Sequence, residues 1–355
     1  MGLLFGFLIF TGFSSFVIYV IRHLLSKHWS WANRLEEEDA RGRTVIITGS
    51  SRGIGKEAAI EFADRHARVI VTARTLEAAK QTVVDIRRKT FFGEVIPMKL
   101  DLGCIQSVKE FYHEIIKSYD TIDILINNAG VLVPSNEIER TADGFETHFG
   151  VNHLGHFLLT NLLLPLLKNA ENSRIVIVSS GTYQKSKLNF DDLNWEKTKP
   201  PPANTNALPH DESEFPLYKI SKLANVLFAK ELTKRLEGTG VHVYTLCPGN
   251  VLTGISRRIK LPLHYYFVYA PLLLLVMKTA RQGCQTILYC ALSKKCAYES
   301  GLMYRNCDLW TSDKYYFPDD ILMPIPDKPV KLNDADASRL WDESEKCLQM
   351  KFPVV

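Results

Sequence analysis

Residues 43–55 read RTVIITGSSRGIG and indicate the architecture more directly than any other stretch. The run Arg43–Thr48 is rich in β-branched residues, which is typical of a buried parallel strand. Glycines follow at positions 49, 53 and 55, and Lys56–Ala67 then has the pattern of a helix. Such a turn indicates a nucleotide site, because the helix N-terminus presents free N–H groups to the phosphates. An ordinary strand-to-helix loop is the alternative.

Strand and helix patterns alternate along the rest of the chain. Strands are expected at 44–47, 69–72, 94–99, 122–126, 174–178 and 241–246, and helices at 76–89, 105–119, 143–167 and 217–236. This alternation predicts an α/β fold, a Rossmann-type doubly wound parallel sheet, over residues 44–310. Residues 311–355 are expected to form a C-terminal extension, with a helix over 333–350 that buries Leu340, Trp341 and Leu348.

The end of the second strand indicates which cofactor the turn binds. A carboxylate there would bind a free 2′-hydroxyl of the ribose. The strand Arg68–Ala73 is instead followed by Arg74, and Arg52 lies inside the glycine turn. Because arginine binds phosphate bidentately, the pair favours the 2′-phosphate of NADP(H), with NAD(H) as the alternative cofactor.

Residues 218–222 read YKISK, which places Tyr218 and Lys222 on one face of a helix. A phenol is a poor base at neutral pH, with a pKa of about 10. An adjacent ammonium stabilises the phenolate and lowers that pKa, which suits the tyrosine to proton transfer. Proton transfer beside a nicotinamide is the chemistry of alcohols and carbonyls.

Composition excludes several other classes of protein. The net charge of +4 is modest and no basic run with interleaved aromatic residues occurs, so nucleic acid is not an expected partner. The 7 cysteines form no C-x-x-C pair, which argues against a zinc site and for reduced thiols. No metal site is expected.

Residues 1–25 are far more apolar than the rest of the chain. No charged side chain occurs before Arg22, and about 20 apolar residues suffice for a helix to span a bilayer. We interpret this segment as a transmembrane signal anchor, with a cleaved signal peptide as the alternative, and residues 26–43 as a linker. The positive charges after the anchor place the remaining chain in the cytosol.

Two further segments leave alternatives open. Residues 261–277 are apolar but are interrupted by two prolines and a histidine, and they form a core helix, a lipid-dipping segment or the wall of a substrate pocket. The substrate side is expected at 255–280. The Pro-rich stretch 194–215 is a long loop that either borders the active site or is a surface insertion.

Three more short segments complete a recognisable order. The turn NNAG occupies 127–130, Asn152 lies in GVNHLGHF, and Ser179-Ser180 closes a strand. With the G-x-x-x-G-x-G turn and Y-x-x-x-K, this order resembles the short-chain dehydrogenase/reductases over about residues 40–310. The segments DGFETHFGVNHLGHFLLT and YKISKLANVLFAKEL are similar to its retinol-dehydrogenase-like branch.

The resemblance implies a role for each matching residue. Tyr218 would be the acid/base, Lys222 would lower its pKa and hold the ribose, Ser180 would bind the substrate oxygen, and Asn152 would relay protons through water. The cofactor would contact Gly49, Ser51, Arg52, Gly53, Ile54, Gly55, Arg74, Asp101, Leu102, Asn128, Ala129, Gly130, Tyr218, Lys222, Pro248, Gly249, Val251 and Thr253.

The same resemblance implies an NADP(H)-preferring oxidoreductase that interconverts a lipophilic alcohol, retinol-like or a longer isoprenoid, and its aldehyde or ketone. A steroid substrate and a catalytically silent NADP(H)-binding membrane scaffold are the alternatives. The endoplasmic reticulum is the expected membrane, with lipid droplets as the alternative. A homodimer is left open.

Overall fold

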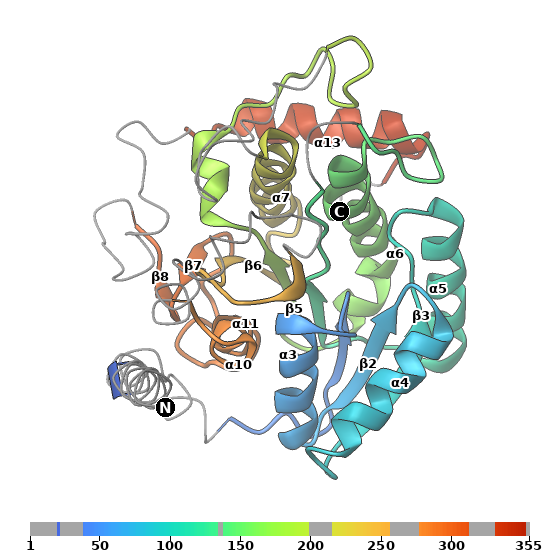
Figure 1. Ribbon diagram of the computed structural model, residues 1–355, viewed down its shortest axis with the longest axis vertical. Helices are drawn as coiled ribbons and strands as arrows, with labels where there is room; N and C mark the ends of the chain where they lie inside the picture. Colours follow the sequence, from blue (N-terminus) through green and yellow to red (C-terminus); the bar gives the residue numbers. More distant parts are fainter. Residues whose placement is uncertain are drawn as a thin grey trace, which may run out of the picture.

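The computed structural model describes residues 20–21, 38–133, 138–198, 215–255, 277–311 and 331–352. Its centre is an 8-stranded sheet in the order β3-β2-β1-β4-β5-β6-β7-β8, in which only the last pair is antiparallel (Figure 1). The strands are β1 (Thr44–Ile47), β2 (Arg68–Ala73), β3 (Glu94–Lys99), β4 (Ile124–Asn127), β5 (Arg174–Val178), β6 (His242–Cys247), β7 (Met303–Arg305) and β8 (Asp308–Leu309).

The sheet is parallel and doubly wound, which confirms the predicted architecture. Strands β1, β4 and β5 are buried along their whole length, as their β-branched sequences predict. The strand order reverses between β1 and β4, where Val45 pairs with both Val69 and Ile124. Ligands of such sheets bind beyond the carboxyl ends of the strands at this reversal.

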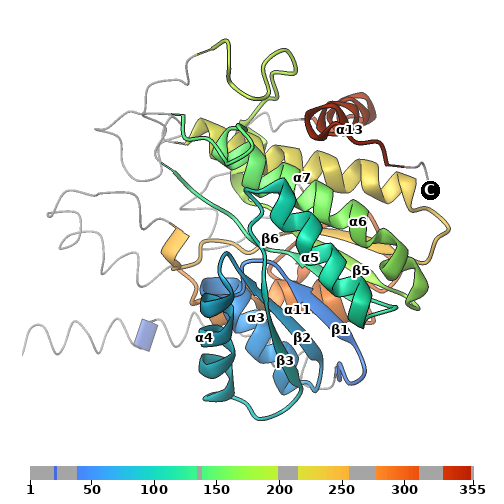
Figure 2. The ribbon, with the colours of Figure 1, turned by 90° about the vertical axis from the view of Figure 1, so that its right-hand side faces the viewer.

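Helices cover both faces of the sheet and enclose two separate hydrophobic clusters (Figure 2). One face carries α3 (Gly53–Asp64), α4 (Leu76–Arg87) and α11 (Gln285–Leu292), with the short α10 (Ala280–Gly283) against α3. The other carries α5 (Ile105–Ser118), a π-helical turn η1 (Phe149–Leu154), α6 (Gly155–Asn169) and α7 (Pro216–Arg235). A 3₁₀ turn, η2 (Gly181–Lys185), follows β5.

The C-terminal helix α13 (Asp334–Leu348) packs along α7 and extends the second cluster. Leu340, Trp341 and Leu348 are buried, as predicted from the periodicity. The guanidinium of Arg235 on α7 lies 4.1 Å from the centre of the Trp341 ring. This helix is therefore part of the same core as the sheet.

One expectation for secondary structure was wrong, and two short strands were missed. The single helix expected at 143–167 begins only at Thr147 and is π-helical from Phe149 to Leu154. The Glu146 carboxylate accepts hydrogen bonds from the N–H groups of His148 and Phe149, which fixes this later start. Strands β7 and β8 were not predicted, because they are too short to show an alternating pattern.

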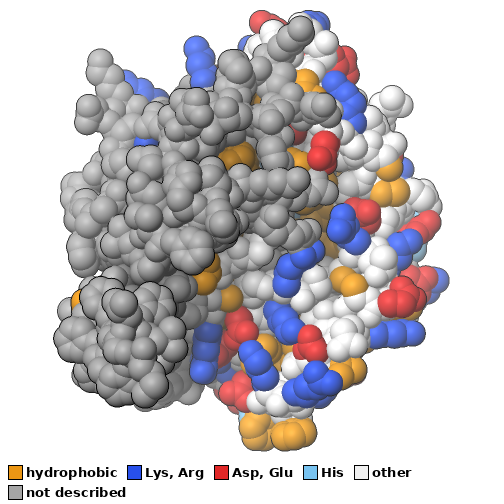
Figure 3. Space-filling model, in the orientation of Figure 1, with side chains coloured by type: hydrophobic (Ala, Val, Ile, Leu, Met, Phe, Trp, Pro, Cys, Tyr) orange, Lys and Arg blue, Asp and Glu red, His pale blue; other side chains and the backbone are white. Residues whose placement is uncertain are grey.

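Several predictions fall outside the described residues. These are the anchor apart from Val20 and Ile21, most of the linker, and segments 199–214, 256–276 and 312–330. Within the described part of the chain, no helix combines the length and the apolar character needed to cross a bilayer. Where Figure 3 shows described side chains, Lys and Arg are interspersed with Asp and Glu.

Candidate active site

A cleft of about 550 Å³ opens at the carboxyl ends of the central strands. Its walls come from the glycine turn, the ends of β2 and β3, the NNAG turn and the start of α7. Sixteen residues of the predicted cofactor set line it: Gly49, Ser51, Arg52, Gly53, Ile54, Gly55, Arg74, Asp101, Leu102, Asn128, Ala129, Gly130, Tyr218, Lys222, Pro248 and Thr253. Gly249 and Val251 do not line it.

The glycine turn and the NNAG turn are locked together. The Thr48 hydroxyl accepts hydrogen bonds from the N–H groups of Asn128 and Ala129, both at 2.9 Å. A side chain at Gly49 would come within 2.9 Å of Ala129, and one at Gly55 within 2.4 Å of the Asn128 amide. Both glycines are therefore required by close approach of the two turns, and Gly49 also has a φ of +62°.

Two arginines stand where the adenosine end of a dinucleotide would lie. Arg52 precedes the first turn of α3 and Arg74 follows β2, and both are exposed on the cleft wall. Neither guanidinium pairs with a carboxylate among the residues that the structure describes. Thr75, next to Arg74, caps α4 by accepting a hydrogen bond from the N–H of Ala78.

The proposed catalytic groups meet at the other end of the cleft. The Nζ of Lys222 lies 5.6 Å from the centre of the Tyr218 ring and donates to the carbonyl of Val178 at 3.1 Å. Ser180 hydrogen-bonds with Tyr218, whereas the Ser179 hydroxyl donates to the Lys222 carbonyl at 2.9 Å. Ser179 lines the cleft and Ser180 lies beside it.

Burial dominates the electrostatics of this pair. It raises the pKa of Tyr218, as does the nearby Cys247 thiol, and the hydrogen bond with Ser180 opposes the shift only in part. Burial also lowers the pKa of Lys222 to about 8. The expectation that Lys222 sets a low pKa for Tyr218 therefore does not hold for the cofactor-free chain, in which the phenol keeps its proton at neutral pH.

Asn152 does not line the cleft but bonds to a residue that does, Val131. Its side chain is fully buried in η1, where Oδ1 accepts from the N–H of Val131 at 2.8 Å and Nδ2 donates to the Val131 carbonyl at 3.1 Å. The same Nδ2 donates to the Ser221 hydroxyl, which in turn donates to the carbonyl of Tyr218. Asn152 thus joins the loop after the NNAG turn to the catalytic helix.

The loop after β6 is fastened from behind by Lys278. This residue donates its N–H to Asn250 and its ammonium to the carbonyl of Pro248. Val251 packs against Gly283 of α10, where a side chain would come within 2.6 Å, and so supports the wall without lining it.

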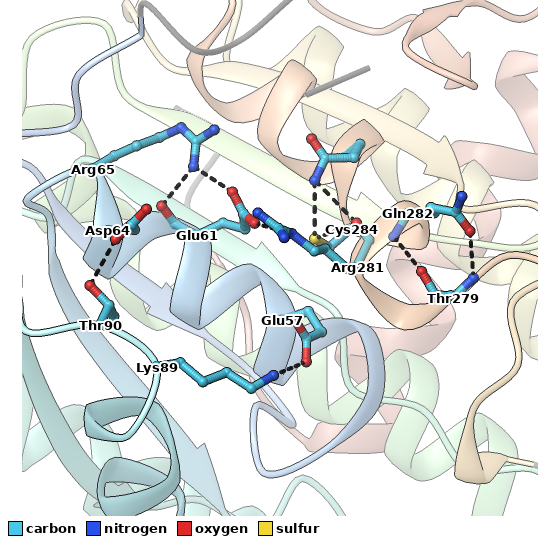
Figure 4. Close-up of polar contacts among 11 residues, drawn as sticks. Glu57, Glu61, Asp64, Arg65, Lys89, Thr90, Thr279, Arg281, Gln282 and Cys284 are labelled. Atoms are coloured by element: carbon cyan, nitrogen blue, oxygen red, sulfur yellow. Dashed lines mark hydrogen bonds and ion pairs between the residues drawn. The ribbon is translucent and has the colours of Figure 1, made fainter. Parts of the chain in front are cut away.

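Helix α10 is tied to the helix of the glycine turn (Figure 4). The buried Glu61 of α3 accepts from Arg281 Nε at 2.8 Å and from Arg65 Nη1 at 2.7 Å. Thr279 and Gln282 form a capping box that begins α10. One turn earlier on α3, Glu57 pairs with Lys89 at 2.9 Å and does not take part in this link.

Sequence reasoning missed several residues of the site. Cys247 was noted only as one of seven reduced cysteines, yet its Sγ accepts from the N–H of Gly181 at 3.2 Å, next to Ser180. Val131 and Leu132 line the cleft but belong to no motif, and Thr147 lines it without having been singled out in its segment. Only the place of Thr147 in the segment DGFETHFGVNHLGHFLLT could have suggested a role.

A nicotinamide dinucleotide fits these residues. A side chain at Gly53 would lie 3.5 Å from the Thr253 methyl and fill the cradle between the turn and the loop after β6. The cleft has an open glycine turn at its centre, two guanidinium groups on one side and the tyrosine–lysine pair on the other. This matches the order of phosphates, adenosine and nicotinamide in such a cofactor.

Known proteins share both sequence and fold with this chain. Residues 43–190 match the family model of the short chain dehydrogenases. Human retinol dehydrogenase 14 is 39% identical over 321 residues, which cover 86% of this chain and 85% of that protein. The chain belongs to the short-chain dehydrogenase/reductases, in their retinol-dehydrogenase-like branch. Membership makes it an NAD(P)-dependent oxidoreductase of CH–OH groups.

Two further proteins resemble the chain over most of its length. Human retinol dehydrogenase 12 is 37% identical over 343 residues, which cover 96% of this chain and 97% of that protein. A crystal structure of an uncharacterised protein from Mycobacterium paratuberculosis superposes with a TM-score of 0.62 at 28% identity, covering 90% of this chain and 98% of that one. The match extends over nearly the whole of this short-chain dehydrogenase/reductase.

Proposed function

We propose that this enzyme uses NADP(H) to interconvert a lipophilic alcohol, retinol-like or a longer isoprenoid, and its aldehyde or ketone. The observation that carries the proposal is the meeting of Tyr218 and Lys222 at one end of a cleft, with Ser180 hydrogen-bonded to Tyr218 beside it and two arginines at the other end. A catalytically silent scaffold would not need a proton donor, a cation and a hydroxyl at one point.

The chain's own residues supply the proton chemistry. When bound, the nicotinamide supplies or accepts the hydride. Ser180 donates a hydrogen bond to the substrate oxygen and orients the carbonyl. Tyr218 gives its proton to that oxygen in reduction, and its raised pKa keeps the proton available at neutral pH. The Lys222 ammonium, 5.6 Å from the ring centre, stabilises the phenolate that remains.

The preference for NADP(H) rests on Arg52 and Arg74. Both residues line the cleft, and Arg74 follows β2, where an NAD-binding site has a carboxylate. A 2′-phosphate there would receive charge-assisted hydrogen bonds, which are about twice as strong as neutral ones.

The substrate class rests on the relatives and on the N-terminal segment. The relatives named above are called retinol dehydrogenases. The apolar run at residues 1–25 supports a membrane anchor, with the catalytic domain on the cytosolic side of the endoplasmic reticulum. Retinoids and isoprenoids partition into membranes, so an anchored enzyme meets them at high local concentration.

Turnover of the full chain in liposomes tests the proposal. Retinal, a long polyisoprenoid aldehyde and a steroid ketone are offered with NADPH or NADH. We expect one of the two isoprenoid-type aldehydes to be reduced, with kcat/KM at least about tenfold higher for NADPH. Arg74→Gln should lose most of that ratio, and a substitution of the exposed Arg88 that follows α4, Arg88→Gln, should keep it. Equal use of the two cofactors would contradict the assignment.

A further inference from the structure

Two buried polar residues lie behind the cleft wall next to Tyr218. Glu146 and His148 are each 2% exposed, while Thr147 between them lines the cleft. The Glu146 carboxylate contacts the imidazole Nδ1 at 2.7 Å and also accepts from the N–H groups of His148 and Phe149. Glu146 therefore fixes both the start of η1 and the orientation of the His148 imidazole.

The other imidazole nitrogen holds the loop that follows the NNAG turn. His148 Nε2 accepts a hydrogen bond from the N–H of Val133 at 3.0 Å, so the proton of the neutral ring is on Nδ1 and points at Glu146. Asn152 holds Val131 two residues earlier. One π-helical segment and the residue before it thus pin both ends of residues 131–133.

The same imidazole also contacts the catalytic tyrosine. Its ring centre lies 6.2 Å from that of Tyr218, with the ring planes at 72° in an edge-to-face arrangement. Tyr218 is therefore bordered by Lys222 and Ser180, which were predicted, and by His148, to which the sequence analysis gave no role.

We propose that His148, oriented by Glu146, is a positioning residue that keeps residues 131–133 and the Tyr218 ring in place for the reaction. The inference rests on the proposed function for its catalytic consequence, but the hydrogen bond to Val133 does not depend on it. Val133 is 2% exposed, so loss of the acceptor leaves a buried N–H without a partner and forces the loop to shift. A displacement of about 1 Å at a reacting group can reduce the rate by about 100-fold.

Three variants separate the hydrogen bond from simple packing. His148→Phe keeps a ring beside Tyr218 and removes both hydrogen bonds. His148→Gln retains an acceptor that can reach Val133. His153→Phe is the matched control, because His153 is equally buried on η1 but bonds to Ser344 on α13.

We measure hydrogen exchange of the peptide containing Val133 in the cofactor-free chain, together with kcat and KM. His148→Phe should exchange at least tenfold faster and lose about 10- to 100-fold in kcat with KM for NADPH within twofold. His148→Gln should restore most of the exchange protection and most of kcat. His153→Phe should match the parent protein in both measurements. Unchanged exchange in His148→Phe, or equal losses in the His153→Phe control, would overturn the proposal. If the parent turns over no carbonyl while the exchange pattern holds, the proposed function fails and the positioning of the loop stands.

Discussion

At the scale of single residues, the pair Tyr218 and Lys222 shows what a motif can and cannot tell. The spacing placed both side chains at one point, because residues four apart share a helical face. The spacing could not predict the pKa values of the two side chains, since burial has the largest effect on both. The proposed role of His148 could not be predicted either, because its partner Val133 precedes it by 15 residues and belongs to an irregular loop.

The lowered pKa of Lys222 predicts a pH dependence. The ammonium is the form that stabilises the phenolate, so kcat/KM for carbonyl reduction should be constant below pH 8 and fall above it, following the pKa of about 8. Because this pKa lies below the ordinary 10.5, the unfolded chain holds more protons between these values, and this group makes the fold more stable as pH rises through that window. Activity should therefore fall there while the melting temperature does not. A flat rate up to pH 10 would contradict this role.

At the scale of elements, the strands were predicted well and the connections less so. Strands β1 and β5 have the predicted bounds, because buried β-branched runs between polar turns are unambiguous. The π-helical turn η1 was invisible in the sequence. Asn152 of this turn bonds to Val131, which is a tertiary contact, and the Glu146 carboxylate caps the helix start locally.

The link between α3 and α10 gives a prediction at this scale. Glu61→Gln removes the charge shared by Arg65 and Arg281, and we expect a loss of about 1 kcal/mol in the free energy of unfolding, since Arg281 is mostly exposed. Because α10 supports Val251, the Kd for NADPH should also rise a few-fold. Urea unfolding and NADPH fluorescence titration measure the two effects.

Glu57→Gln is the matched control on the same helix. Its partner Lys89 is half exposed and lies away from α10, so we expect a change below about 0.5 kcal/mol and no change in NADPH affinity. Equal effects of the two substitutions would show that α10 does not support the cofactor wall.

At the scale of the whole molecule, the site needs contributions from segments far apart in the chain. The order of motifs predicted the sheet and sixteen residues of its cleft, because each motif follows a strand of one parallel sheet. The C-terminal helix was predicted from its periodicity, but its packing on α7, the helix of Tyr218, could not be. Amphipathic periodicity shows that a face is buried and does not show what it is buried against.

The central claim is that this family member transfers a proton through Tyr218 at a cleft built for NADP(H). Tyr218→Phe removes one oxygen atom and keeps the ring beside Lys222 and His148. The most direct test is to measure NADPH binding and carbonyl reduction of this variant side by side. We predict an unchanged Kd for NADPH and a fall in kcat of at least about 1,000-fold. Full turnover in the variant would contradict the account.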